Sequence, residues 1–235
     1  MGRYQMSMSY IPQLYDFLSR LQANNNREWF RANKTEYDAL REQWLADIDR
    51  LIADMTQWWP QLAGLSAKQC AYRIYRDTRF SQDKSPLKDF FSAGFSPLGR
   101  KAHDAGYYLQ MGPGRFSSEV ESGLYGGVWC PEPAVLKKLR KAIVDNIEEF
   151  EEIVNEPRLA KNFPGWCASS MLKTVPKGYD KNHPQAHLLR LRDYGKFMPA
   201  PMEYFTDPSW PERTSEFFSV LKPLIDFLDY SINEE

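Results

Sequence analysis

The stretch Gly106-Tyr107-Tyr108-Leu109-Gln110-Met111-Gly112-Pro113-Gly114 decides the fold class. An apolar and aromatic run ends at Met111, a Gly-Pro-Gly turn follows, and a second aromatic run covers residues 116–125. Such a turn between two short runs is typical of a β-hairpin. Residues 90–95 form another aromatic run, and residues 69–80 alternate in type. Because no crossover helix of about a dozen residues separates these runs, they predict an antiparallel sheet.

Helical periodicity lies on both sides of this central group. Before it, apolar residues recur every three or four positions in residues 14–21 and 37–59, and Pro60 ends the second pattern. After it, helix signals stand near Pro133, Pro184 and Ser209, with a division at Asp145 and a bend expected at Pro223.

These patterns predict an α+β protein in which N- and C-terminal helices wrap a mainly antiparallel sheet. We expect a single domain over residues 11–235 after a flexible N-terminus at residues 1–10. A division into two subdomains near residue 156 is the alternative.

Composition excludes several classes of protein. The chain has 235 residues, of which 43% are hydrophobic, 26% charged and 14% aromatic, which is not the composition of a disordered, collagen-like or coiled-coil protein. No run reaches the roughly 18 apolar residues of a membrane span, and the first residues lack the apolar core of a signal peptide. Three widely spaced cysteines fit a reducing compartment. A cytoplasmic protein without a membrane partner is therefore expected.

Charge is balanced overall but distributed in blocks. Lysine and arginine total 30 against 31 acidic residues, so the chain as a whole has no charge that points to nucleic acid. Residues 68–103 carry eight Lys/Arg against three Asp, and residues 171–196 carry six against two. Residues 142–156 and the last 37 residues are acidic. Either these blocks pair or form solvated faces, or the two basic blocks converge on an anion site.

The segment of residues 72–88 carries the candidate site. If it continues as a strand without a bulge, Arg73, Asp77 and Arg79 share one face, because alternate side chains of a strand point the same way. Arginine binds phosphate and carboxylate in a planar fork, and a carboxylate between two arginines would orient one of them. A structural salt-bridge network is the alternative. The candidate anion-binding residues of this segment are Arg73, Arg76, Asp77, Arg79, Lys84 and Lys88. From outside the segment, we expect that Lys101 and Lys177 can reach the same site. Its aromatic rim is expected at Tyr72, Tyr75, Tyr107 and Tyr108.

Four motifs resemble the family called domain of unknown function 2461. They are residues 24–30 (NNNREWF), residues 73–81 (RIYRDTRFS) with Asp83-Lys84 and Pro86, residues 106–108 (GYY), and residues 176–179 (PKGY) with His183-Pro184. The likeness extends roughly from Leu14 to Leu228 and implies a single domain, but it transfers no activity. The chain departs from the family pattern at Leu87, where an aromatic residue is expected, and at Gly126-Gly127, which interrupts a segment.

Motifs for other chemistry fail on inspection. His183 and His187 have the spacing of two zinc ligands on a helix, but Pro184 replaces the glutamate of that motif and no cysteine is near, so no metal or cofactor is expected. No phosphate loop, dinucleotide fingerprint or serine elbow occurs, and catalytic residues stay unassigned. We therefore expect a phosphate- or carboxylate-bearing small molecule to bind in a basic, aromatic-rimmed pocket. Nucleic-acid binding and a protein-interaction role are the alternatives.

Overall fold

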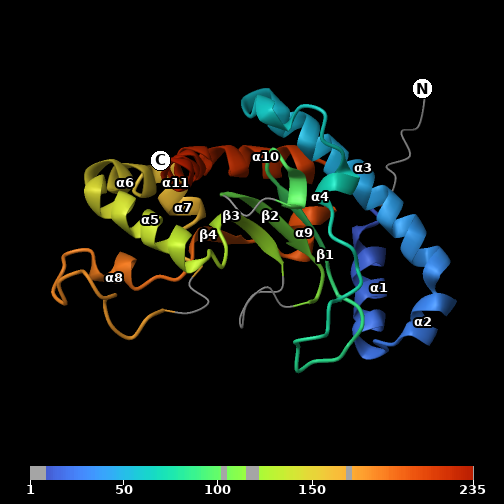
Figure 1. Cartoon of the computed structure of the whole chain (residues 1–235). Helices are drawn as coiled ribbons and strands as arrows, with labels where there is room; N and C mark the ends of the chain where they lie inside the picture. The colour runs from blue at the N-terminus through green and yellow to red at the C-terminus, as the bar shows by residue number, and fades with distance from the viewer. Residues whose placement is uncertain (1–8, 102–104, 115–121, 168–170, 235) are drawn as a thin grey trace. The chain divides into compact units, whose positions relative to one another are not determined.

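The computed structural model describes residues 9–101, 105–114, 122–167 and 171–234 (Figure 1). The α-helices are α1 (Ile11–Ala23), α2 (Arg27–Ala32), α3 (Lys34–Trp58), α4 (Ala67–Cys70), α5 (Pro133–Asp145), α6 (Ile147–Val154), α7 (Pro157–Asn162), α8 (Ala186–Leu189), α9 (Met202–Thr206), α10 (Trp210–Val220) and α11 (Lys222–Asn233). Two 3-10 turns are η1 (Pro60–Leu62) and η2 (Gly99–Lys101). The strands are β1 (Phe91–Phe95), β2 (Gly106–Met111), β3 (Gly123–Val128) and β4 (Tyr194–Pro199).

The four strands form one antiparallel sheet in the order β1-β2-β3-β4, flanked by helices, which confirms the α+β prediction. The runs at residues 90–95 and 106–111 contain β1 and β2 as predicted. The run at residues 116–125 only overlaps β3, and residues 115–121 lie outside the described part of the chain.

The strand predicted at residues 69–80 is wrong. After α4, residues 72–90 form a basic loop whose two arms meet only at isolated bridges, Ala71 with Ala93 and Tyr75 with Leu87. Between the two bridges, three residues of one arm (72–74) stand opposite five of the other (88–92), so the pairing bulges. Regular pairing stops here because Pro86 accepts the N–H of Arg76 but has no N–H to donate in return. The backbone of Leu87 faces away from the other arm and bonds to the side chain of Asn25, at 2.9 and 3.1 Å.

Helix boundaries follow the sequence signals with two corrections. The division at Asp145 separates α5 from α6, as predicted. Pro223 does not bend one long helix but stands in the first turn of α11, where the missing proline N–H has no helical partner to lose. Residues 157–162 form α7, which the sequence pattern did not predict.

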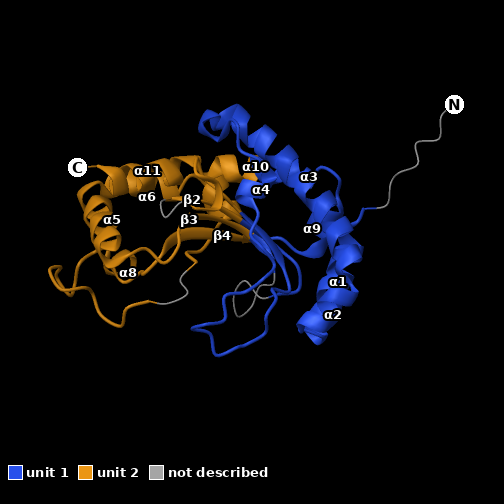
Figure 2. Cartoon of the chain, turned by 45° about the vertical axis from the view of Figure 1, so that its right-hand side comes forward, with its two compact units in different colours: residues 1–93, 109–123, 199–215 blue, residues 94–108, 124–198, 216–235 orange. Residues whose placement is uncertain are grey.

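The chain divides into two compact units built from interleaved segments (Figure 2). Unit 1 comprises residues Met1–Ala93, Leu109–Gly123 and Pro199–Ser215, and unit 2 comprises Gly94–Tyr108, Leu124–Met198 and Glu216–Glu235. Neither unit ends near residue 156. The single domain over residues 11–235 stays a prediction, and of the flexible N-terminus predicted at residues 1–10, residues 1–8 lie outside the described part.

Each unit has buried side chains of its own. Those of unit 1 include Phe17, Trp44, Ile48, Phe205 and Trp210, and those of unit 2 include Phe95, Phe150, Phe163, Tyr194 and Phe218. No helix in the described part of the chain is both long enough and apolar enough to cross a membrane.

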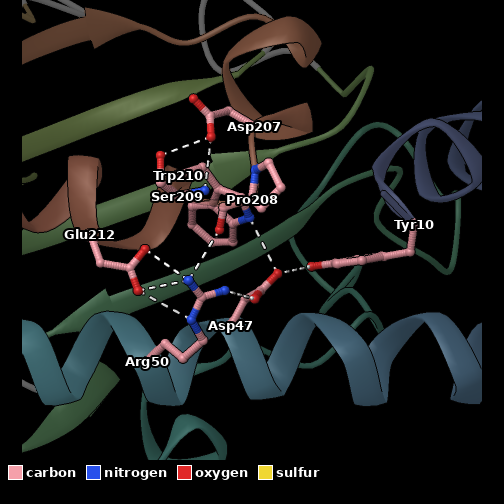
Figure 3. Close-up of polar contacts among 8 residues, drawn as sticks. All are labelled: Tyr10, Asp47, Arg50, Asp207, Pro208, Ser209, Trp210 and Glu212. Carbon is pink, nitrogen blue, oxygen red and sulfur yellow. Dashed lines mark hydrogen bonds and ion pairs between the residues drawn. The ribbon is translucent and has the colours of Figure 1, made fainter. Parts of the chain in front are cut away.

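A polar network in unit 1 joins α3 to the first turn of α10 (Figure 3). Oδ2 of Asp47 accepts hydrogen bonds from the Tyr10 hydroxyl at 3.0 Å and from the Trp210 indole N–H at 3.3 Å. Its Oδ1 accepts one from Arg50 at 3.0 Å, and Arg50 also donates to both carboxylate oxygens of Glu212, at 2.7 and 2.9 Å. Burial and the Asp47 carboxylate raise the pKa of Tyr10, so the phenol stays protonated as a donor.

Replacing Asp47 by alanine should lower the free energy of unfolding by about 2 to 3 kcal/mol. The Trp210 side chain is only 1% exposed, so its indole N–H would lose its acceptor where little water can replace it. The matched control is Asp38→Ala on the same helix, which removes only an exposed pair with Lys34 and should cost less than about 0.5 kcal/mol. Urea unfolding curves measure both, and equal losses would contradict the structural role of Asp47.

Candidate anion-binding site

The basic loop of residues 72–90 is held by backbone and side-chain contacts within unit 1. The Arg76 N–H donates to the carbonyl of Pro86 at 2.9 Å, and the Lys88 N–H donates to the carbonyl of Ile74 at 2.8 Å. Ile74 and Leu87 are buried, and the Asn25 side chain brackets the backbone of Leu87. The side chains that carry charge therefore project from a fixed base.

Two of the predicted arginines form ion pairs inside this loop. Arg79 donates to Asp77 at 2.7 Å, and both side chains are substantially exposed. Hydrogen bonds from the side chain and backbone of Arg79 lower the pKa of Asp77 to about 2. Arg76 pairs with Asp83, whose pKa lies well below its usual range because it accepts hydrogen bonds from Arg76 and then from Ser85.

Two further charged side chains of the loop, Asp89 and Lys84, also have partners. Asp89, the third acid in residues 72–90, accepts a hydrogen bond from Gln22 at 2.7 Å. The ammonium of Lys84 donates to the carbonyl of Thr78 at 3.0 Å. All three acids of the loop are thus engaged, and the loop still carries five Lys/Arg against them.

Positive charge gathers around Lys88, in a group that we call the cationic cluster: Arg41, Arg73, Arg76 and Lys88. Of these, Arg76 is the member that is paired, with Asp83. Lys88 is partly buried, and its pKa is lowered first by burial and then by the charges of Arg73, Arg41 and Arg76. Within the described residues, no carboxylate forms an ion pair with Lys88, Arg73 or Arg41. Arg73 does help to lower the pKa of Asp77, as the weakest of several causes. Bringing like charges together in a partly desolvated place destabilises the fold unless an anion joins them.

Aromatic rings line the cationic cluster. The Lys88 ammonium lies 5.0 Å from the centroid of the Tyr72 ring and 5.8 Å from that of Phe90. The Arg41 guanidinium carbon lies 5.9 Å from the centroids of Trp44 and Phe91. These rings hold Lys88 and Arg41 in place through cation–π contacts, which do not neutralise their positive charge.

The structure therefore brings together three of the predicted residues, Arg73, Arg76 and Lys88. Arg79 and Asp77 pair with each other, and Lys84 is bound to a backbone carbonyl. Lys101 and Lys177 are exposed residues of unit 2, and their contribution to a site in unit 1 stays a prediction. Of the predicted aromatic rim, Tyr72 contacts Lys88 of the cluster. The ring centroid of Tyr75 lies 5.8 Å from that of Phe30, and Tyr107 is buried beside Phe218 in unit 2.

Sequence reasoning missed Arg41. It belongs to α3, between Leu40 and Trp44, four residues after Tyr37. Tyr37, Leu40 and Trp44 are buried, so Arg41 stands beside the apolar stripe of the helix, at a spacing where a nonpolar side chain is the usual choice. An arginine at the spacing of the apolar residues was the feature of the sequence that could have indicated this partly buried cation.

Metal-binding chemistry has no described site. Within residues 9–101, 105–114, 122–167 and 171–234, no group of three or more His, Cys, Asp or Glu side chains is placed to hold a metal ion. The Nδ1 atom of His183 accepts the backbone N–H of Gln185 at 3.0 Å, a role in the local turn.

Comparison with known proteins identifies a family over most of the chain. The model of the family described as "Conserved hypothetical protein (DUF2461)" matches residues 13–227, which confirms the resemblance seen in the four motifs. No curated protein matches the chain, and no solved structure does.

Proposed function

Because the chain belongs to the DUF2461 family, whose description carries no activity, we propose a function from the cationic cluster: it binds a phosphate- or carboxylate-bearing small molecule. One observation carries this proposal. Lys88 is partly buried among Arg73, Arg41 and Arg76, and Asp83 is the one acid of the same loop that forms an ion pair with this cluster, at Arg76. Asp77 and Asp89 are engaged elsewhere. A ligand anion would supply the missing negative charge.

Phosphate is the better fit of the two anions. A phosphate monoester carries nearly two negative charges and three acceptor oxygens, and several cations gather at this place. A carboxylate has one charge and would leave most of the cluster uncompensated. The rings of Tyr72 and Phe90 beside Lys88 offer apolar faces to the rest of the ligand. The proposal is for binding, and it assigns no reaction.

Thermal melting against a panel of sugar phosphates, nucleotides and their dephosphorylated forms tests this proposal. A phosphorylated compound at about 100 times its dissociation constant should stabilise the wild-type protein by roughly 2.7 kcal/mol. Arg73→Gln should lower the affinity for that compound about tenfold or more, because the variant loses charge-assisted hydrogen bonds to it.

Arg79→Gln is the matched control for Arg73→Gln. Arg79 belongs to the same loop and is similarly exposed, but it is already paired with Asp77, so the affinity should change less than about threefold. A panel that leaves the wild-type melting temperature unchanged would argue against the proposal. Equal losses in the two variants would point to general loop electrostatics instead of a site.

One observation favours the nucleic-acid alternative. Phe80, in the same basic loop, is 95% exposed, and the Arg79 guanidinium carbon lies 5.8 Å from its ring centroid. Exposed aromatic rings beside cations can stack on unpaired bases. A short single-stranded oligonucleotide in the same melts separates the two functions: binding that falls steeply with salt and is lost in Phe80→Ala would favour the nucleic acid.

A further inference from the structure

Unit 2 holds a cavity of about 590 Å³, outside the cationic cluster. Its apolar wall comes from Pro131 and Pro133 at the start of α5, from Leu136 on that helix and from Leu172. The volume suits a small organic molecule, for which sites of roughly 300 to 1,000 Å³ are usual. Two arginines, Arg140 and Arg192, complete the wall together with Cys130 and Asp193.

Arg140 is the unusual member of this wall. Its side chain comes from α5 and the residue is only 8% exposed. Its Nη2 donates to the carbonyl of Leu191 at 2.8 Å, and it also bonds to the hydroxyl of Tyr194. Its Nε–H has no acceptor, and no carboxylate forms an ion pair with it, among the residues that the structure describes. An arginine stays charged in a protein, so Arg140 is a largely buried cation without a paired carboxylate at a cavity wall. Its Nε is enclosed by protein atoms, so a ligand would meet the rest of the guanidinium.

The acid of the cavity is committed to another task. Oδ1 of Asp193 accepts the backbone N–H of Cys130 at 2.7 Å, and the Cys130 thiol also bonds to this carboxylate. Cys130 has φ +47°, the left-handed region that residues other than glycine rarely adopt. Asp193 therefore fixes a strained turn that places the thiol at the cavity, and it does not pair with Arg140.

We propose that this cavity binds an organic carboxylate, with its charged group on Arg140 and Arg192 and its apolar body against Leu136 and Leu172. A carboxylate fits better than a phosphate because one buried guanidinium, helped by one exposed arginine, matches a single negative charge. The site uses no residue of the cationic cluster, so it stands or falls independently of the proposed function.

Protection of Cys130 from iodoacetamide tests this proposal in the intact protein. The thiol is exposed, and peptide mapping separates it from Cys70 and Cys167. Burial and Asp193 raise the pKa of Cys130, so the reaction is best followed near pH 9, where a thiolate fraction exists. The probe is 3-phenylpropionate, and its neutral amide is the control compound. At about ten times its dissociation constant, the carboxylate should slow Cys130 alkylation roughly tenfold, and the amide should not.

Two variants locate the effect. Arg140→Gln would also break the bond to Leu191, so Arg192→Gln and Leu136→Trp carry the test: the first removes the exposed charge and the second fills the cavity. Both should lose protection, while Lys137→Gln, an exposed neighbour on α5, should keep it. The proposal is overturned by equal protection from the amide, by no protection from the carboxylate, or by protection that survives both variants.

Discussion

Replacing Gly127 by alanine should lower the free energy of unfolding by about 4 kcal/mol or more. A Cβ atom at Gly127 would lie 2.2 Å from the carbonyl oxygen of Tyr194 and 2.3 Å from the Cα of Gly195. Both are backbone atoms of β4, so no side-chain rotation can relieve the clash. Gly127 also has φ +146°, a conformation that costs any other residue steric strain. The two penalties act together, and the β3–β4 pairing must open to avoid them.

The matched control for this prediction is Gly165→Ala. Gly165 also belongs to unit 2, and a Cβ added there would meet no atom within 4 Å. Its effect on the free energy of unfolding should stay within about 0.5 kcal/mol. Urea unfolding followed by far-ultraviolet circular dichroism measures both variants. A Gly127→Ala protein that unfolds within about 1 kcal/mol of wild type would show that β3 and β4 can separate without loss of the fold.

Gly127 also shows how far the sequence could predict the fold. The Gly126-Gly127 pair stands out in the sequence as an interruption of a strand. Its cause, the close approach of β4, joins residues almost seventy positions apart and leaves no periodic signal. Helix and strand periodicity predicted the α+β class because each depends on neighbours a few residues away. The strand predicted at residues 69–80 failed because its pairing partner, residues 86–93, contains Pro86, which has no N–H to continue the pairing.

The candidate sites could also be predicted only in part from the sequence, but two arginines follow a pattern that could have been recognised. Arg41 follows the pattern Tyr37-x-x-Leu40-Arg41-x-x-Trp44, and Arg140 follows Leu136-x-x-Leu139-Arg140-x-x-Ile143. Each arginine stands at apolar-stripe spacing on its helix and is at least half-buried. Charge density along the chain directed attention to residues 72–88 and could not find either one. The cost of burying a cation makes such positions a sharper signal than a dense basic run.

Lys88→Met should raise the free energy of unfolding by about 1 kcal/mol at low salt. The same substitution should lower the affinity for the phosphorylated ligand at least tenfold. Methionine keeps the apolar stem that packs near Tyr72 and Phe90, but it removes a charge that burial and three arginines disfavour. The lost cation–π contact opposes this gain with about 0.5 kcal/mol. If Lys88 stabilised the fold, its replacement would lower the free energy of unfolding. A loss of more than about 1 kcal/mol would therefore favour the structural salt-bridge interpretation.

The pH dependence of this gain has a definite direction. The pKa of Lys88 is lowered from 10.5 in the folded protein, so below that lowered pKa both states carry the charge and its penalty is fully present. As the pH rises from there toward 10.5, the folded protein releases the proton before the unfolded chain does. Wild-type stability should therefore recover relative to Lys88→Met across this window, and the advantage of the variant should shrink. Urea unfolding of both proteins from pH 7 to 10 measures the difference, in which other titrating groups cancel. An advantage that stays constant over this range would mean that the Lys88 charge is not its cause.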